Sequence, residues 1–203
     1  MKSFMSVCAA LLVFFASAPL AQAADPYVGL SAGVSILNSS DAKTPIGTLD
    51  NVLEYETGYG VNGALGIDGG MYRIEGAVGY QANSVETAWG MPASDDEEVS
   101  VLSFMANGYL DLGMVGAMVE PYVMAGIGVA NVSATDNIGT DDSDTVLAYQ
   151  FGGGLAFNAT PNVAVDLGYR YFLAGDVTFD DIDPDVDYTV SGHNIMGGVR
   201  VGF

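Results

Sequence analysis

The chain is poor in cations, in cysteine and in long apolar runs. It has 5 Lys and Arg against 25 Asp and Glu, a formal net charge of −20. So few cations argue against binding the phosphate backbone of a nucleic acid. One cysteine excludes an intramolecular disulfide framework and a cysteine-based zinc site. Half of the residues are nevertheless hydrophobic, which argues against disorder. The apolar and acidic residues must therefore be segregated along the chain.

The N-terminal residues form the one long apolar run. Lys2 precedes an apolar stretch at residues 4–18, and Ala21-Gln22-Ala23 has the small-x-small pattern of a cleavage site. The alternative, a membrane anchor, needs ~20 apolar residues, more than this run offers. We therefore expect residues 1–23 to be a cleaved secretory signal peptide and residues 24–203 to be a single domain. The only cysteine, Cys8, belongs to the signal peptide.

The remaining chain alternates apolar residues with small or polar ones, at the period of two that predicts strands. We expect eight strands, at residues 27–36, 57–67, 72–82, 101–112, 121–130, 147–157, 163–173 and 190–203. Most reach the ~9–11 residues that a tilted strand needs to cross a bilayer. The links alternate between long and short, and the long ones cover residues 37–56, 83–100, 131–146 and 174–189. Outer-membrane barrels have such long outer loops and short periplasmic turns.

Each strand has an apolar face and a face of Gly, Ser and Ala with a few charged residues. A soluble lipocalin-like barrel would turn the apolar face inward around a ligand. Three observations favour the opposite arrangement. Small residues suit a narrow eight-stranded interior, and all three arginines lie on the polar face. The aromatic residues of the apolar face lie near the strand ends, as at membrane–water interfaces. They are Tyr72, Phe157 and Phe203 at the short-turn end, and Tyr59, Tyr80, Phe104, Tyr149 and Tyr171 towards the loops. The prediction is an all-β, eight-stranded antiparallel up-and-down transmembrane β-barrel.

Several stretches of the chain resemble the small outer-membrane β-barrel proteins of Gram-negative bacteria, the OmpA/OmpX-like and opacity-type porin family. They are GYGVNGALGIDGGMYRIEGAVGY (58–80), PYVMAGIGVA (121–130), FGGGLAFN (151–158), VDLGYRYF (165–172) and GGVRVGF (197–203). Gly198, Val201 and the terminal Phe203 are similar to the C-terminal signal read by the barrel-assembly machinery, although Met196 stands where a polar residue is usual. The resemblance implies a monomeric barrel in the cell outer membrane, in contact with outer-membrane lipid. It implies no single activity, because the family ranges from structural proteins to adhesins.

Five charged residues on the polar face are expected to meet in the lumen: Arg73, Glu75, Asp166, Arg170 and Arg200. An uncompensated buried charge costs several kcal/mol, so we expect an Arg–carboxylate network. Asn62, Asn107, Gln150 and Asn194 would complete its hydrogen bonds, and Met105, Tyr109, Tyr122 and Met124 would narrow the lumen. Such a network acts either as a structural plug or as a gate for ions.

Catalysis has little support in the sequence. A lipid-modifying enzyme needs a Ser, a His and an orienting acid within reach of one another. The chain has only His193, two residues from Ser191, with no carboxylate obviously beside them. We expect no cofactor and no transition-metal site, because no phosphate-binding Gly-rich loop and no His/Cys cluster occurs.

The long links contain most of the acid. They hold 19 of the 25 Asp and Glu against one cation, Lys43. Asp181, Asp183, Asp185 and Asp187 form a run that suggests a weak calcium site, since calcium prefers carboxylate oxygens. This run lacks the Gly and the distal Glu of the usual helix-loop-helix site, and a solvated acidic loop is the simpler interpretation. A third reading is bridging, through divalent cations, to neighbouring phosphorylated glycolipid.

The function that these observations favour is that of a non-enzymatic outer-membrane barrel with a structural or surface-exposed role. The alternatives are a porin for small solutes or ions, an adhesin or surface antigen, a lipid-modifying outer-membrane enzyme, and a soluble periplasmic ligand-binding barrel.

Overall fold

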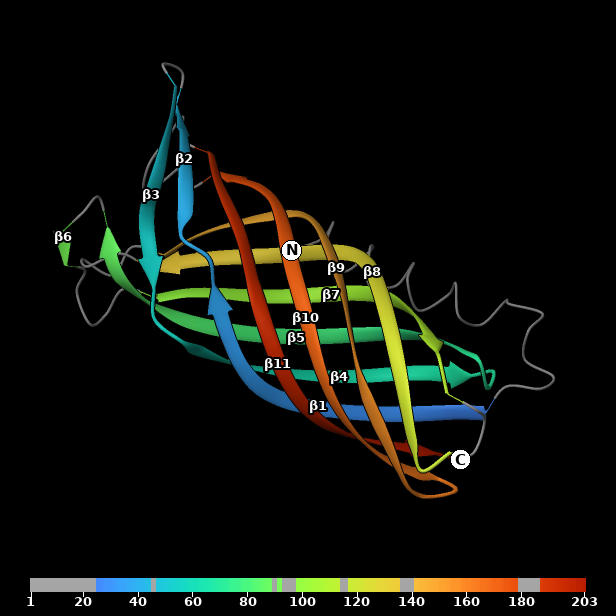
Figure 1. Cartoon of the computed structure of the whole chain (residues 1–203). Helices are drawn as coiled ribbons and strands as arrows, with labels where there is room; N and C mark the ends of the chain where they lie inside the picture. Colours follow the sequence, from blue (N-terminus) through green and yellow to red (C-terminus); the bar gives the residue numbers. More distant parts are fainter. Residues whose placement is uncertain are drawn as a thin grey trace.

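The fold is a closed antiparallel β-barrel (Figure 1). The computed structural model describes residues 25–44, 47–88, 91–92, 98–113, 117–135, 141–178 and 187–203. Eight strands form the wall: β1 (Asp25–Leu37), β4 (Gly58–Asp68), β5 (Tyr72–Ala88), β7 (Glu98–Asp111), β8 (Val119–Thr135), β9 (Asp141–Thr160), β10 (Val163–Thr178) and β11 (Asp187–Gly202). Each pairs antiparallel with the next, and β1 pairs with β11 to close the sheet. The predicted eight-stranded barrel is therefore confirmed. Within the described ranges, no helix is long and apolar enough to cross a membrane.

The short links lie at the barrel end where β1 begins and β11 ends (Figure 1). β4 joins β5 through Gly69, Gly70 and Met71. Gly70 has a φ of 87°, a left-handed conformation that costs a glycine almost nothing. Its amide donates to the Asp68 side chain over 2.8 Å, and the Gly69 amide donates to the Tyr72 carbonyl. Local turn chemistry therefore fixes this hairpin.

The opposite end, called here the loop end, contains three further strands. β2 (Ser40–Thr44) and β3 (Gly47–Tyr55) form a hairpin within the first long link. β2 pairs with β11, and β3 pairs with β5, so the hairpin extends the wall above β1 and β4. The two-residue β6 (Met91–Pro92) pairs with β5. The prediction of a plain loop at residues 37–56 was therefore wrong.

The apolar face of each wall strand points outward, as predicted. Leu30 is 73% exposed and Leu65 is 60% exposed. The alternating positions Tyr27, Arg73 and Glu75 are at most 5% exposed. Outward aromatic residues such as Tyr72 and Tyr80 on β5 are separated along the barrel axis by about 20 Å, at ~3.3 Å per residue and a tilt of ~40°. This separation is close to the height of a membrane-embedded apolar band.

The strands continue beyond this band at the loop end, and there the two faces exchange polarity. On β8, the outward side chains change from Val123 and Ile127 to Asn131 and Ser133, while the inward Val132 is 0% exposed. β9 begins at Asp141 and β5 continues to Ala88, so parts of the predicted loops 83–100, 131–146 and 174–189 are strands. The prediction of long loops there was wrong because acidic and polar outward residues resemble loop composition. Above the membrane band, the barrel has the polarity of a soluble barrel.

Candidate functional site

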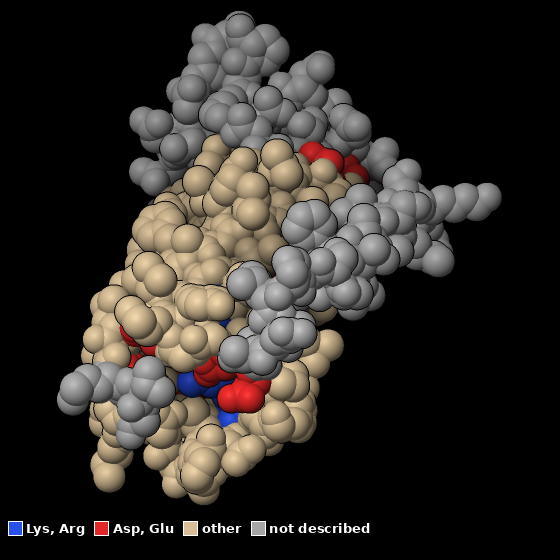
Figure 2. Space-filling view, turned by 90° about the vertical axis from the view of Figure 1, so that its right-hand side faces the viewer, with Lys and Arg blue, Asp and Glu red and all other residues tan. Residues whose placement is uncertain are grey.

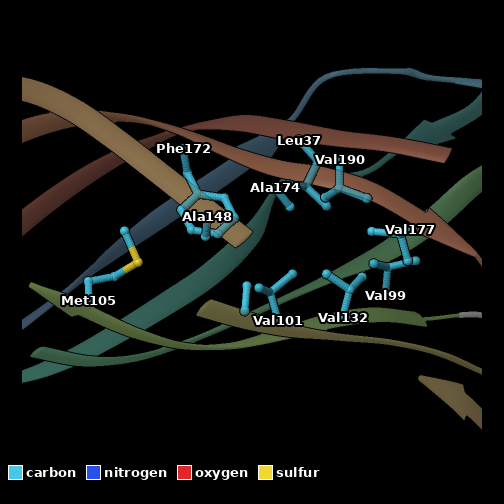
Figure 3. Packing of buried hydrophobic residues seen from close by; sticks show 11 residues of the cluster. Leu37, Val99, Val101, Met105, Val132, Ala148, Phe172, Ala174, Val177 and Val190 are labelled. Atoms are coloured by element: carbon cyan, nitrogen blue, oxygen red, sulfur yellow. The ribbon is translucent and has the colours of Figure 1, made fainter. Parts of the chain in front are cut away.

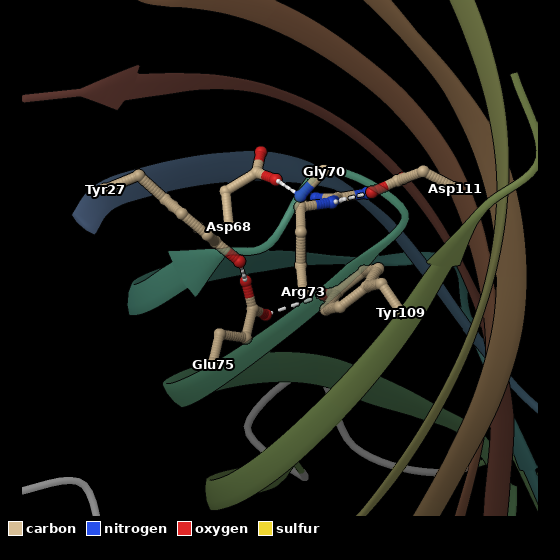
Figure 4. A network of polar contacts seen from close by, with 7 residues as sticks. All are labelled: Tyr27, Asp68, Gly70, Arg73, Glu75, Tyr109 and Asp111. Atoms are coloured by element: carbon tan, nitrogen blue, oxygen red, sulfur yellow. Dashed lines mark hydrogen bonds and ion pairs between the residues drawn. The ribbon is translucent and has the colours of Figure 1, made fainter. Parts of the chain in front are cut away.

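The lumen at the short-turn end contains a buried ion pair between Arg73 of β5 and Asp111 of β7 (Figure 4). Nε and Nη2 of Arg73 donate to Oδ2 and Oδ1 of Asp111, both over 2.8 Å. The two side chains are 3% and 8% exposed. The guanidinium carbon also lies 4.4 Å from the ring centroid of Tyr109 and 5.1 Å from that of Tyr122. Arg73 is therefore held by a two-point ion pair and two aromatic faces.

Glu75, two residues further along β5, is stabilised by hydrogen bonds from uncharged groups. Its carboxylate accepts from the hydroxyl of Tyr27 over 3.0 Å, from the hydroxyl of Tyr109 over 2.6 Å and from the amide of Asn107 over 3.0 Å. Gln150 in turn donates to Asn107 over 2.6 Å. Residues from β1, β5, β7 and β9 are thereby connected across the lumen.

Arg170, Arg200 and Asp166 stand around a cavity of about 50 Å³ beside this network. In the described part of the chain, neither Arg170 nor Asp166 forms a hydrogen bond or ion pair. The structure thus brings the five expected lumen residues together but does not join them by ion pairs. The arginine that is paired uses Asp111, which sequence analysis did not single out. Asp111 lies at alternate positions from Asn107 and Tyr109, so the strand period could have identified it.

Glycines make room for the tyrosines that fill this layer. A Cβ atom at Gly66 would lie 2.4–2.7 Å from ring atoms and the hydroxyl of Tyr27, and one at Gly154 would lie 2.6 Å from the hydroxyl of Tyr122. Tyr109 and Tyr122 are 5–6% exposed and their rings meet edge-on at 5.6 Å. Met105 and Met124 are also buried, so all four residues expected to narrow the lumen point into it.

The loop end of the lumen is filled by an apolar cluster that sequence analysis missed (Figure 3). Its members come from six wall strands and are at most 5% exposed: Leu37, Val99, Val101, Met105, Ala130, Val132, Ala148, Phe172, Ala174, Val177 and Val190. Tyr55 of the β2–β3 hairpin and Val85 of β5 pack against it. Several members fall in stretches assigned to loops from the sequence, which is why the cluster was not predicted.

His193 and Ser191 lie near the outer rim on the outward face and have separate partners. Nδ1 of His193 is 2.7 Å from the hydroxyl of Tyr169, and its ring packs against Tyr169 and Tyr171 with centroids 5.8 and 5.1 Å away. The hydroxyl of Ser191 accepts from the Asn38 amide over 3.0 Å. Within the described residues, no carboxylate orients His193. The arrangement is that of an aromatic cluster at a membrane interface.

The C-terminal residues complete the closure of the barrel. Gly198 pairs with Ser31 of β1 and with Asp166 of β10, and Val201 pairs with Val28 and Val163. Phe203 donates its amide to the carbonyl of Pro26 over 3.0 Å, while its side chain is 68% exposed. Their recognition by the assembly machinery stays a prediction.

The suggested calcium run lies largely outside the described residues. This applies to Asp181, Asp183 and Asp185. Asp187 is the first residue of β11. In the backbone register of the sheet it lies opposite Lys43 of β2 and Thr178 of β10. Among the residues that can be assessed, no group of three or more His, Cys, Asp or Glu could hold a metal ion. The calcium site stays a prediction.

Comparison with known proteins agrees with this architecture. Residues 6–203 match the family model of the outer membrane protein beta-barrel domain. The chain is 25% identical to the outer membrane protein PagN of Salmonella typhimurium over 240 aligned positions, covering the whole of both chains. The crystal structure of neisserial surface protein A aligns with a TM-score of 0.60 at 23% identity, over 88% of this chain and 97% of that one. A major outer membrane protein from Thermus thermophilus aligns with a TM-score of 0.51 at 15% identity, over 90% and 100% of the two chains. The chain belongs to the outer membrane protein beta-barrel domain family, and it is an eight-stranded barrel of the bacterial outer membrane.

Proposed function

We propose that this protein is a closed, non-enzymatic outer-membrane barrel that acts through its structure and its exposed surface rather than by passing solutes. The observation that carries the proposal is the apolar cluster at the loop end. Val101 and Val190 from opposite sides of the cluster are 1–2% exposed, and Phe172 is 4% exposed. An apolar cluster of this kind leaves no wet path for an ion, which needs polar or hydrated surroundings.

The polar layer below the cluster supports the same proposal. Two cavities in this layer have volumes of only about 50 and 40 Å³. Arg73, Asp111 and Glu75 hold neighbouring strands together inside the narrow barrel. Their arrangement supports a structural plug over an ion gate, since each has its hydrogen-bond partners within the wall.

The proposed surface role rests on the position of the acidic residues. Residues at the loop end that face water include Glu86, Glu98 and Ser143, and the long links carry most of the acidic residues. A partner of this surface would have to be basic or bound through cations. An adhesin or surface antigen therefore remains compatible with the proposal.

The proposal extends to processing, assembly and partners. Residues 1–23 would be removed as a signal peptide, and Gly198, Val201 and Phe203 would be read by the barrel-assembly machinery. The outward apolar band would contact outer-membrane lipid, and a closed barrel without a free edge needs no second copy for stability. Lipid modification is disfavoured because the Nδ1 atom of His193 lies beside Tyr169 rather than beside a carboxylate.

Single-channel recording tests whether the lumen is closed. We expect the purified, refolded barrel to give no stepwise current in planar bilayers. Replacing two plug residues, Phe172→Ala with Met105→Ala, should introduce current steps because it removes the bulk between the polar layer and the loop end. The matched control is Phe151→Ala, since Phe151 lies on the outward face and is 56% exposed. Steady conductance by the unaltered protein would favour the porin alternative.

A further inference from the structure

One cavity in the lumen has charged walls whose hydrogen bonds are incomplete. It lies at the short-turn end, has a volume of about 50 Å³ and is bounded by residues of β1, β4, β5, β7, β8, β10 and β11. The charged side chains on its wall are Arg73, Glu75, Asp166, Arg170 and Arg200. A cavity needs only ~10–15 Å³ for one water molecule, so this one accommodates a group the size of a single tetrahedral oxyanion.

Two of these side chains are already satisfied by the protein. Arg73 is bound at two points by Asp111. Glu75 accepts hydrogen bonds from Tyr27, Asn107 and Tyr109. Together with Asp111, they account for one positive and two negative charges, and three neutral donors stabilise the carboxylate of Glu75 without cancelling its charge. Arg170, Arg200 and Asp166 remain, and their single net positive charge balances that of Glu75, so the case for a ligand rests on the unused donors of the two arginines.

Among the described residues, neither Arg170 nor Arg200 has a carboxylate or carbonyl as a hydrogen-bond acceptor. Nη1 of Arg200 is buried and has no hydrogen-bond partner, and the guanidinium carbon lies 5.5 Å from the ring centroid of Tyr27. Arg170 forms no hydrogen bond or ion pair with the described residues. A buried guanidinium nitrogen without an acceptor, such as Nη1 of Arg200, is unfavourable, because arginine does not lose its proton in proteins. The unused donor of Arg200 therefore favours an additional acceptor in the cavity, and an oxyanion accepts more strongly than a neutral group.

The cavity is oriented towards the periplasm. The short turns and the C-terminal strand end lie at its end of the barrel (Figure 1). Figure 2 faces that end, and it shows blue cationic side chains beside red acidic ones within the surrounding surface. The strands of the wall separate the cavity from the lipid. An anion from the aqueous phase has access here, whereas a lipid headgroup outside the wall does not.

We propose that this cavity is a binding site for one small periplasmic oxyanion, such as inorganic phosphate, held by Arg170 and Arg200. Asp166 opposes binding, because its carboxylate shares the same wall. The proposal stands apart from the surface role proposed above, since the site is at the opposite end of the barrel and requires no conduction.

Calorimetric titration with inorganic phosphate tests the site. The refolded full-length mature barrel in neutral detergent micelles is titrated at constant ionic strength, with chloride as the exchanged anion. We expect binding of one phosphate per barrel. Arg200→Gln should weaken binding at least tenfold, as expected from the loss of charge-assisted hydrogen bonds. Asp166→Asn should tighten it several-fold, because a nearby negative charge is removed.

Matched variants distinguish a built site from general electrostatics. Lys43→Gln removes one positive charge at the loop end and should leave phosphate binding unchanged. Arg170→Gln gives a second test if Arg200→Gln does not refold, and refolding is checked by heat-modifiable migration on a gel. Adding phosphatidylglycerol to the micelles should not compete with phosphate. The proposal is overturned if the unaltered barrel binds no phosphate, or if Lys43→Gln weakens phosphate binding as much as Arg200→Gln does. It is also overturned if Asp166→Asn fails to tighten phosphate binding, or if phosphatidylglycerol competes with phosphate.

Discussion

Arg73 illustrates what a charged residue requires inside a narrow barrel. Its guanidinium is 3% exposed and cannot become neutral, so the Asp111 carboxylate and two tyrosine rings replace water around it. The strand period placed Arg73 inside the lumen correctly. It did not identify Asp111 as the partner, because cross-strand register depends on the lengths of the turns, and several carboxylates were available.

Removing one partner of this ion pair should lower the free energy of unfolding more than removing both partners. We expect Asp111→Asn to lower the free energy of unfolding by about 3–5 kcal/mol, since a buried arginine loses its counter-charge. The double variant Arg73→Met with Asp111→Leu should remain within about 1–2 kcal/mol of the unaltered protein. Urea unfolding in micelles, followed by circular dichroism, measures both changes. Equal losses in the single and double variants would show that the pair contributes through packing alone.

At the scale of the strands, alternation identified all eight wall strands, but it made most of them too short at the loop end. β9 begins at Asp141 rather than at residue 147, and β5 continues to Ala88 rather than ending at residue 82. The missed segments still alternate, with apolar residues inside and polar residues outside. They were assigned to loops because the prediction required an apolar outward face for a strand, and the outward face of these segments is polar. The apolar cluster at the loop end was missed for the same reason.

The exchange of polarity makes a specific prediction for adjacent residues of β8. Val132→Asn should reduce the unfolding free energy by about 2–4 kcal/mol, because it buries an amide without partners and removes apolar packing. Ser133→Asn, on the outward face one residue later, should change it by no more than about 0.5 kcal/mol. The same urea titration compares the two. Similar effects at both positions would contradict an apolar interior at this level.

At the scale of the whole molecule, the resemblance to outer-membrane barrels gave the fold and the location, which the family match and the structural comparisons confirm. It gave neither the pairing of the lumen charges nor the filling of the loop end. Those depend on contacts between strands distant in sequence, such as Gln150 with Asn107.

The single cysteine allows the orientation in the membrane to be tested. Cys8 lies in the predicted signal peptide, so the mature unaltered protein should not react with a membrane-impermeant maleimide. Ser143→Cys, at the loop end, should be labelled on intact cells. Met118→Cys, at a short turn where the side chain is 79% exposed, should be labelled only after the outer membrane is permeabilised. Labelling of Met118→Cys on intact cells would reverse the orientation, and labelling of the unaltered protein would show that residues 1–23 are retained.

The exchange of polarity along the wall also fixes the height of the barrel in the membrane. Moving the barrel outward by one pair of residues, about 5 Å at ~3.3 Å per residue and a ~40° tilt, would bring apolar side chains at the level of Val129 into water. Moving it inward by the same amount would place Asn131 and its neighbours in hydrocarbon, where unpaired polar groups are costly. Both displacements are opposed, so the acidic end stays at a constant distance above the lipid headgroups. Any ligand that binds this end must therefore do so at the same fixed height above the membrane.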